Sequence, residues 1–309
     1  MTTQKVHRVS VAMSVYNPRA EYFREQVDSI LGQTSEPVLV MRNDGSPNLE
    51  TVALCDEYTD RDNVVVIDGV NLGFAAGFLA ALRACPDTDY YAFSDQDDFW
   101  LPEKLSRAVE ELDKAGAVAD SVPVMYHSDF VFCDQNLNEV EDTPNRRLSS
   151  SLENAVAEAA IPGMVMVFNR AMRERLLSVD PDGIAGHDWL CALISNGYGK
   201  TISDPRVSLK YRRHSENVSA GNMGAFQRLS FRIRTFLFGE TVGKVRVMIK
   251  RVATACSGEF SAHNRELIDL YSRPITVLTQ LRKAFWPVRY RETVGDELAF
   301  RLLVLLGRM

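Results

Sequence analysis

The stretch DYYAFSDQDD, residues 89–98, indicates how the chain folds and where its polar chemistry lies. Residues 89–94 are apolar and aromatic enough for a buried strand, which runs directly into Asp95, Gln96, Asp97 and Asp98. Three carboxylates so close repel one another unless a cation neutralises them, and Mg²⁺ and Mn²⁺ favour oxygen ligands. The alternative is a helix N-terminus, where Asp98 would be a cap before a helix with Pro102 in its first turn.

The residues upstream repeat the same arrangement of strand and helix. Buried strands are predicted over 8–16, 36–41 and 63–68, and each is followed by a helix. Strands that alternate with helices of about a dozen residues are typical of an α/β fold with a mostly parallel sheet. Ligands bind outside the carboxyl ends of such strands. Polar clusters fall at three of these ends, namely Tyr16-Asn17, Asn43-Asp44-Gly45 and Asp95-Gln96-Asp97-Asp98.

The pattern changes beyond residue 120. A long strand is predicted over 122–133, and a shorter one over 163–168. A helix over 187–195 precedes two short strands, and everything from residue 225 onward reads as helical. The two short strands are predicted over 200–203 and 207–211.

Composition excludes several classes of protein. The 309 residues are 46% hydrophobic and 25% charged, which is ordinary for a globular chain. The five cysteines include no CxxC pair, so a structural zinc site is not expected and a reducing compartment fits. The N-terminus lacks a signal-peptide pattern, and no apolar run approaches the roughly 18 residues that span a bilayer. A cytoplasmic protein is therefore expected.

Charge is unevenly distributed along the chain. Residues 225–309 hold 15 Lys and Arg against 7 Asp and Glu, whereas residues 1–224 hold 20 against 34. An acidic front and a basic tail indicate two modules with different partners.

Three further motifs can each be interpreted as functional or as purely structural. In Asn43-Asp44-Gly45-Ser46, Asp44 could accept a pyrimidine imide N–H, or the motif is an ordinary Asp-Gly turn. In Gly186-His187-Asp188-Trp189, a partly desolvated Asp188 could act as a base, or the motif caps a helix with Trp189 in the core. In Tyr211-Arg212-Arg213-His214, His214 could complete a metal shell and Arg212 bind a diphosphate, or the loop is solvated.

Taken in order, these motifs resemble glycosyltransferase family 2, the inverting enzymes with a GT-A fold. The resemblance covers roughly residues 8–220, and no GxGxxG or P-loop pattern competes with it. It is carried by 11–17 (VAMSVYN), 43–46 (NDGS), 71–74 (NLGF), 93–98 (FSDQDD), 161–170 (IPGMVMVFNR), 187–189 (HDW) and 211–214 (YRRH). It implies a Rossmann-like central sheet with helices on both faces, followed by a C-terminal helical extension.

The resemblance also implies a role for each matching residue. Tyr16 and Asp44 would hold the nucleotide base with Asn17 nearby, and Asp95 would lie near the ribose. Asp97 and His214 would bind a divalent cation, Mn²⁺ or Mg²⁺, and Arg212 with His214 would meet the diphosphate. Asp188 would be the general base, with Gly163 and Trp189 near the donor sugar or acceptor. One departure is Asn43, which stands where the family usually has a first acidic residue.

The motifs at 161–170, 187–189 and 211–214 are most similar to the rhamnosyltransferase branch of the family. This similarity implies a dTDP-β-L-rhamnose donor and a saccharide acceptor of bacterial surface polysaccharide. A UDP-sugar donor and a non-catalytic sugar-nucleotide-binding scaffold stay as alternatives. The expected organisation is a GT-A domain over 1–224, with a nucleotide-sugar half over 1–120 and an acceptor half over 121–224, then a basic helical region over 225–309.

The basic tail has two interpretations. Basic residues interleaved with aromatics, as at Arg282, Lys283, Phe285 and Trp286, suit an anionic membrane surface. This fits an acceptor on a lipid diphosphate and a peripheral location at the inner face of the cell membrane. The alternative is a helical subdomain packed on the core or on a second subunit, which would make a homodimer. No nucleic-acid-binding motif accompanies the charge, so nucleic acid is not expected as a partner.

Overall fold

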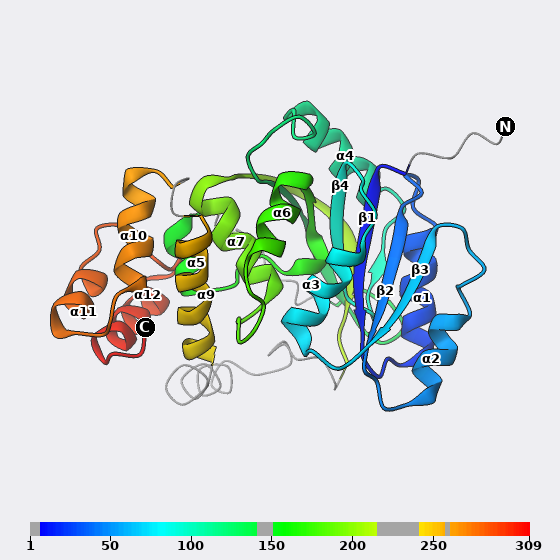
Figure 1. The fold of residues 1–309 in the computed structure, drawn as a ribbon, viewed down its shortest axis with the longest axis horizontal. Helices are drawn as coiled ribbons and strands as arrows, with labels where there is room; N and C mark the ends of the chain where they lie inside the picture. The colour runs from blue at the N-terminus through cyan, green and yellow to red at the C-terminus, as the bar shows by residue number, and fades with distance from the viewer. Residues whose placement is uncertain (1–6, 141–150, 215–240, 257–259) are drawn as a thin grey trace.

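The computed structural model describes residues 7–140, 151–214, 241–256 and 260–309. Their centre is one eight-stranded mixed sheet with the strand order β3-β2-β1-β4-β7-β6-β8-β5 (Figure 1). The C-terminal helices lie beside it, at the opposite end of the molecule from β3. The α/β class predicted from the alternation of strands and helices is confirmed.

The first half of the sheet is parallel. Strands β1 (Val9–Val15), β2 (Val38–Asp44), β3 (Val64–Gly69) and β4 (Tyr90–Ser94) pair side by side in the same direction. Crossovers between parallel strands are right-handed, so the steps from β1 to β3 place their helices on one face, and the return step to β4 places its helix on the other. Those helices are α1 (Ala20–Leu31) and α2 (Leu49–Asp56) on the first face, and α3 (Phe74–Ala84) on the second.

The second half of the sheet runs in both directions. Strand β7 (Met166–Asn169) lies antiparallel between β4 and β6 (Val124–Cys133), and β8 (Lys200–Arg212) is parallel to β6. Strand β5 (Phe99–Trp100), which the sequence pattern did not indicate, pairs with β8 at the edge. Helices α4 (Lys104–Lys114), α6 (Arg170–Ser178) and α7 (His187–Tyr198) pack around this half.

Three predicted elements need correction. The segment 163–168 begins as a 3₁₀ turn, η1 (Gly163–Val165), before it becomes β7. The two short strands predicted over 200–203 and 207–211 are the single strand β8, whose register against β6 shifts around Asp129. The helix expected to hold Pro102 starts later, at Lys104, with Glu103 as its first flanking residue.

The C-terminal region is helical where the structure describes it. Helices α9 (Thr241–Ala255), α10 (Ala262–Ser272), α11 (Val277–Ala284) and α12 (Val294–Leu305) follow one another, and α9 packs against α7. The short helix α5 (Leu152–Ala157) is a further link, because Asn154 donates a hydrogen bond to the Tyr290 carbonyl. The predicted boundary at residues 224 and 225 lies outside the described residues, so the domain division stays a prediction.

Two properties of the described chain concern its helices and its cysteines. Within the described ranges, no helix is both long and apolar enough to cross a bilayer. All five cysteines are buried and none forms a disulfide. Burial raises the pKa of the Cys55 and Cys85 thiols to about 12, so these groups are protonated and unreactive at neutral pH.

Candidate functional site

Asp95 and Asp188 form an acidic pair at the carboxyl end of β4. Asp95 directly follows β4, and Asp188 lies in the first turn of α7. Burial raises the pKa of Asp95, and the nearby charges of Asp97 and Asp188 raise it further. Burial also raises the pKa of Asp188 to about 6, against the hydrogen bond that its carboxylate accepts from the Trp189 N–H. The fold therefore brings together carboxylates from two distant segments.

Asp97 and His214 join the two halves of the chain. The His214 Nε2 lies 2.8 Å from the Asp97 Oδ2, across 117 residues of sequence. His214 follows the end of β8, and its ring packs against Tyr22 of α1 with centroids 5.4 Å apart. The two residues predicted to bind a cation are thus in direct contact.

Asp97 and His214 suit a cation whose coordination is completed by groups that do not come from the protein. Among the described residues, no group of three or more His, Cys, Asp or Glu side chains is arranged as a complete metal shell. Asp97 and His214 supply one carboxylate and one imidazole. Mg²⁺ commonly takes only one or two carboxylates from protein and completes its coordination with substrate phosphates and water. The pair is therefore suited to an ion bridging to a diphosphate.

Asp98 is a structural residue rather than the helix cap that its position suggested. It is fully buried, and its Oδ1 accepts the backbone N–H of Arg212 at 3.1 Å. Burial raises the pKa of Asp98 well above its ordinary value, with Asp97 and Asp95 adding to the effect. Asp98 thereby fixes the end of β8 against residues 95–98, the acidic turn. This attachment holds His214 close to Asp97.

Arg212, predicted to meet the diphosphate, is engaged within the protein. Its side chain is buried, and its Nε donates to the Asp97 carbonyl at 2.9 Å. The two terminal nitrogens donate to the Gln135 carbonyl and to the Glu25 carboxylate, and the guanidinium lies 4.2 Å from the centre of the Tyr22 ring. Arg212 therefore holds the acidic turn in place.

We expect Arg212→Ala to act first on stability. The substitution leaves the Asp97 and Gln135 carbonyls without their donor and removes a buried cation, so a loss of about 3 kcal/mol in unfolding free energy is expected. Denaturant unfolding measures the change. The exposed Arg61→Ala is the control and should unfold like the wild type. Unchanged stability of Arg212→Ala, together with lost donor binding, would instead assign the guanidinium to the diphosphate.

The end of β2 is held by Asp44 and Asn43. Asp44 is buried and accepts hydrogen bonds from the backbone N–H groups of Leu72 and Gly73, and it pairs with Arg42. Asn43 donates from Nδ2 to the Asp68 Oδ1 at 2.9 Å, so the residue that departs from the family pattern bridges β2 to β3. Asp44 thus organises the loop before α3, and its predicted contact to the nucleotide base stays a prediction.

Tyr16 and Asn17 lie at the end of β1, beside the acidic turn. The Tyr16 side chain is 46% exposed, which leaves its ring available to stack on a ligand. The Gln96 amide clamps the Tyr16 backbone through two hydrogen bonds, of 2.9 and 3.1 Å. Asn17 adopts a left-handed backbone conformation, with φ of 42°, and its N–H donates to the Ser46 Oγ.

Gly163 lies directly against the start of α7. A Cβ atom at this position would come within 2.5 Å of the His187 Nε2. The His187 ring cannot retreat easily, because it stacks on Phe78 at 4.0 Å and meets Phe93 edge-on at 4.5 Å. Burial lowers the pKa of His187 to about 3, so the ring is neutral. Gly163 thus allows His187 and Asp188 to lie beside the acidic turn.

Trp189 is part of the core. Its side chain is buried, and its indole N–H donates to the Ala155 carbonyl of α5. These contacts agree with the alternative in which Trp189 belongs to the core. Its predicted place near the sugar or acceptor stays a prediction. Sequence reasoning missed Gln96 and Arg42 as supports of the site, although Gln96 lies inside the acidic motif itself.

Comparisons with known proteins place this geometry in a family. Residues 10–176 match the model for Glycosyl transferase family 2, which is more than half of the chain. The chain therefore belongs to glycosyl transferase family 2, as the ordered motifs predicted.

Two curated relatives extend the comparison. The uncharacterized glycosyltransferase alr2836 of Nostoc sp. is 28% identical over 220 residues, covering 68% of this chain and 66% of that protein. The dTDP-rhamnosyl transferase RfbG of Shigella flexneri is 23% identical over 316 residues, covering 96% of this chain and 99% of that protein.

Two solved structures confirm the GT-A architecture. One is S. aureus TarS 1–349 in complex with UDP-GlcNAc, with a TM-score of 0.60, 13% identity, and coverage of 97% of this chain and 80% of that one. The other is the mannosyltransferase PcManGT from Pyrobaculum calidifontis in complex with GDP-Man and Mn²⁺, with a TM-score of 0.55, 17% identity, and coverage of 98% and 87%. At these identities the likeness shows the fold.

Proposed function

We propose that this chain is an inverting, cation-dependent glycosyltransferase that moves L-rhamnose from dTDP-β-L-rhamnose to a hydroxyl of a lipid-linked saccharide in bacterial surface polysaccharide synthesis. The observation that carries the proposal is the contact of Asp97 with His214 next to the Asp95–Asp188 pair. The rhamnosyl donor is supported by the similarity to RfbG along almost the whole of both chains.

The proposed reaction is one in-line displacement at the anomeric carbon. The acceptor oxygen bonds to that carbon as the bond to the diphosphate oxygen breaks, and the acceptor proton passes to Asp188. Burial makes the Asp188 carboxylate more basic than an exposed one, while its pKa of about 6 leaves it ionised at neutral pH. Configuration inverts, so a β-linked donor gives an α-rhamnoside.

The leaving group is the nucleoside diphosphate. Asp97 and His214 would hold the divalent cation, which when bound neutralises negative charge on the departing diphosphate. Asp98 and Arg212 keep these two ligands together by fixing the end of β8 to the acidic turn. Tyr16 would stack on the base, and Gly163 would leave room beside Asp188 for the acceptor.

Calorimetric titration tests the donor and the cation together. Wild-type protein is titrated with dTDP-rhamnose, UDP-glucose and UDP-GlcNAc, each with Mn²⁺ and with EDTA. We expect dTDP-rhamnose to bind selectively and only with the cation. Asp97→Ala should lose the difference between Mn²⁺ and EDTA, because one of two protein ligands is gone. Asp180→Ala, an exposed carboxylate, is the matched control and should keep it.

Each other outcome selects an alternative. Selective binding of a UDP-sugar, as in the TarS complex with UDP-GlcNAc, would keep the family and discard rhamnose. Binding of a donor with neither transfer nor hydrolysis would favour a non-catalytic scaffold. An unchanged metal response of Asp97→Ala would remove Asp97 from the cation site.

The C-terminal helices would bring the enzyme to a lipid-linked acceptor. We propose a peripheral, cytoplasmic position at the inner face of the cell membrane, with the basic helical region against anionic lipid. Its basic and aromatic residues do not all remain available for lipid. Trp286 is buried and donates to Glu153, Arg291 pairs with Glu158, and Arg251 pairs with Asp180. Residues 228–238 of the predicted basic stretch lie outside the described residues.

A further inference from the structure

The outer surfaces of α11 and α12 are apolar. On α11, the exposed side chains Val277, Leu278, Leu281 and Phe285 follow one face at helical spacing, with exposed fractions from 42% to 78%. On α12, the exposed Val294, Leu298, Leu302, Leu305 and Leu306 do the same, from 46% to 67%. Eleven of the nineteen large apolar side chains found exposed in the described residues fall within 275–306. Such a concentration on one helical pair is typical of an interaction surface.

Both helices are well defined at their starts. Thr276 and Thr279 form a reciprocal capping box at the start of α11. The Thr293 side chain accepts the Asp296 N–H at the start of α12. Local sequence therefore fixes where each helix begins.

The inner side of the same pair combines apolar and polar side chains. Ala284, Phe300 and Val304 are buried there, together with Gln280, Lys283 and Glu297. The Gln280 amide donates to the Val304 carbonyl at 2.6 Å and to the Met309 main-chain oxygen at 2.8 Å, and the Lys283 Nζ donates to the same Met309 oxygen. Glu297 is buried and pairs with Arg301 at 2.6 Å. The leucines on the outside are more than the core of a water-soluble helix pair requires, and a leucine-rich outer face fits a pair that lies against a hydrocarbon layer.

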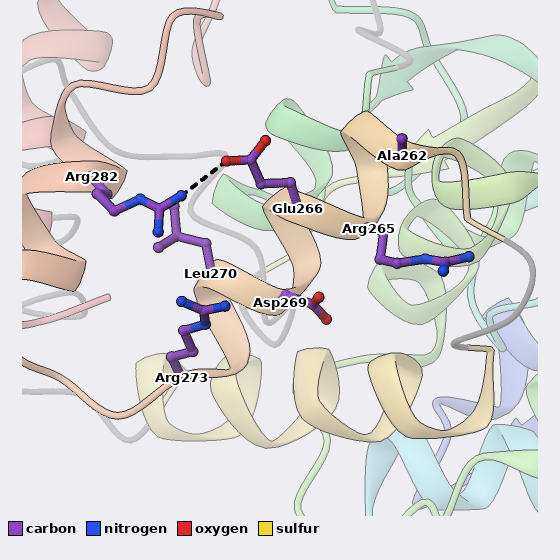
Figure 2. A pocket seen from close by; sticks show the side chains of 7 residues that line it. All are labelled: Ala262, Arg265, Glu266, Asp269, Leu270, Arg273 and Arg282. Atoms are coloured by element: carbon purple, nitrogen blue, oxygen red, sulfur yellow. Dashed lines mark hydrogen bonds and ion pairs between the residues drawn. The ribbon is translucent and has the colours of Figure 1, made fainter.

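A basic pocket adjoins the apolar face. Its volume is about 420 Å³, and Arg265, Arg273 and Arg282 line it together with Glu266 and Asp269 (Figure 2). Glu266 pairs with Arg282 at 3.0 Å. Arg282 is one turn from both Leu278 and Phe285, so the pocket opens beside the apolar residues of α11. Guanidinium groups beside exposed leucines suit the phosphates of lipid head groups.

Charge distinguishes a lipid surface from a second copy of the chain. Residues 273–309 carry seven Lys and Arg against three Asp and Glu. Lys283 and Glu297 are buried, and Arg282 and Arg291 pair with Glu266 and Glu158, so four Arg stand against Glu292 and Asp296. A two-fold interface would place this positive excess against itself, whereas an anionic bilayer complements it. We propose that the apolar face of α11 and α12 inserts into the interface of an anionic phospholipid bilayer, with the arginine pocket at the head groups. This deepens the membrane contact of the proposed function and locates it in residues 273–309.

Flotation with vesicles tests the proposal directly. Wild-type protein is mixed with phosphatidylcholine vesicles, with and without phosphatidylglycerol, and should float with the anionic vesicles. The Leu298→Gln/Leu302→Gln variant should bind about tenfold more weakly or worse, because two half-exposed leucines no longer enter the hydrocarbon. The Leu49→Gln/Val118→Gln variant removes two apolar side chains that are 84% and 50% exposed and lie far from this face, and it should float like the wild type.

Other results would overturn the proposal. Equal flotation of both variants, or no flotation of the wild type at low salt, would show that the face does not meet lipid. A dimer in sedimentation that the Leu298→Gln/Leu302→Gln variant splits, without a change in flotation, would assign the face to a second copy. The vesicles hold neither donor nor acceptor, and donor calorimetry is measured separately, so failure here leaves the transferase proposal untouched.

Discussion

The Asp188→Asn variant should lose between about 10²-fold and 10⁴-fold in turnover while it binds the donor almost as well as the wild type. A positioned general base contributes this much to a proton transfer, and an amide cannot take the proton. The Asn oxygen can still accept the Trp189 N–H, so the start of α7 should keep its geometry. Steady-state kinetics and donor calorimetry on the same preparation measure the two effects separately.

The same variant should be at least as stable as the wild type at neutral pH. The pKa of Asp188 is raised from 3.8 to about 6, so the fold disfavours its charged form. Below about pH 4 the group is protonated in the folded and unfolded states alike, and it has no effect on stability. Between about pH 4 and pH 6 the wild type loses stability that Asp188→Asn keeps, and above pH 6 the difference stays constant. Thermal unfolding at pH 4 and pH 8 should show the difference growing with pH.

Wild-type activity should follow the same ionisation. The rate should rise with pH through about 6 and then level off, because the base acts only when deprotonated. The exposed Asp182→Asn, six residues upstream, should change neither the rate nor the profile. Full turnover by Asp188→Asn would assign the base to another residue, and Asp95, whose pKa the Asp188 charge raises, would be the next candidate.

Gly163→Ala should damage both stability and turnover. The new Cβ would lie 2.5 Å from the His187 Nε2 and 3.5 Å from the Asp188 Cβ. Overpacking of this kind costs about 1–3 kcal/mol, and a shift of about 1 Å at a catalytic group costs about 100-fold in rate. Denaturant unfolding and steady-state kinetics should both reveal the substitution.

A glycine in open surroundings supplies the control for that substitution. Gly243 lies in α9, and a Cβ there meets nothing within 4 Å. Gly243→Ala should therefore stabilise the protein by up to about 1 kcal/mol through helix propensity, with unchanged turnover. If Gly163→Ala behaved like Gly243→Ala, the tight packing between Gly163 and His187 would not matter for function.

The parallel half of the fold could be predicted because its signals are local. The strand before Asp95 and the three before it are continuous apolar runs that end in polar turns. The antiparallel half was harder to predict from the sequence. Strand β5 is only two residues long, and the residues of η1 are apolar enough to suggest a strand. The apolar outer face of α12 could not be recognised either, since a leucine-rich helix is expected to point those residues inward.

The sequence indicated where the site residues lie in the fold, but it indicated less well which residues they contact. Asp97 and His214 do meet, although 117 residues separate them, because both lie at strand ends of one sheet. Arg212 looked like a ligand for a diphosphate, yet its neighbours Glu25, Gln135 and Tyr22 come from segments whose proximity no spacing reveals. Asp98 looked like a cap because Pro102 follows it, but the helix starts later and the side chain turns to β8 instead.

The burial of all five thiols leaves the surface of the native protein without a group that reacts readily with a maleimide. A single cysteine introduced at the exposed position 298 would therefore carry a fluorophore without prior removal of any native residue. An environment-sensitive dye there would brighten as the surrounding water is replaced by acyl chains. The same label at position 49 would report only the bulk solvent.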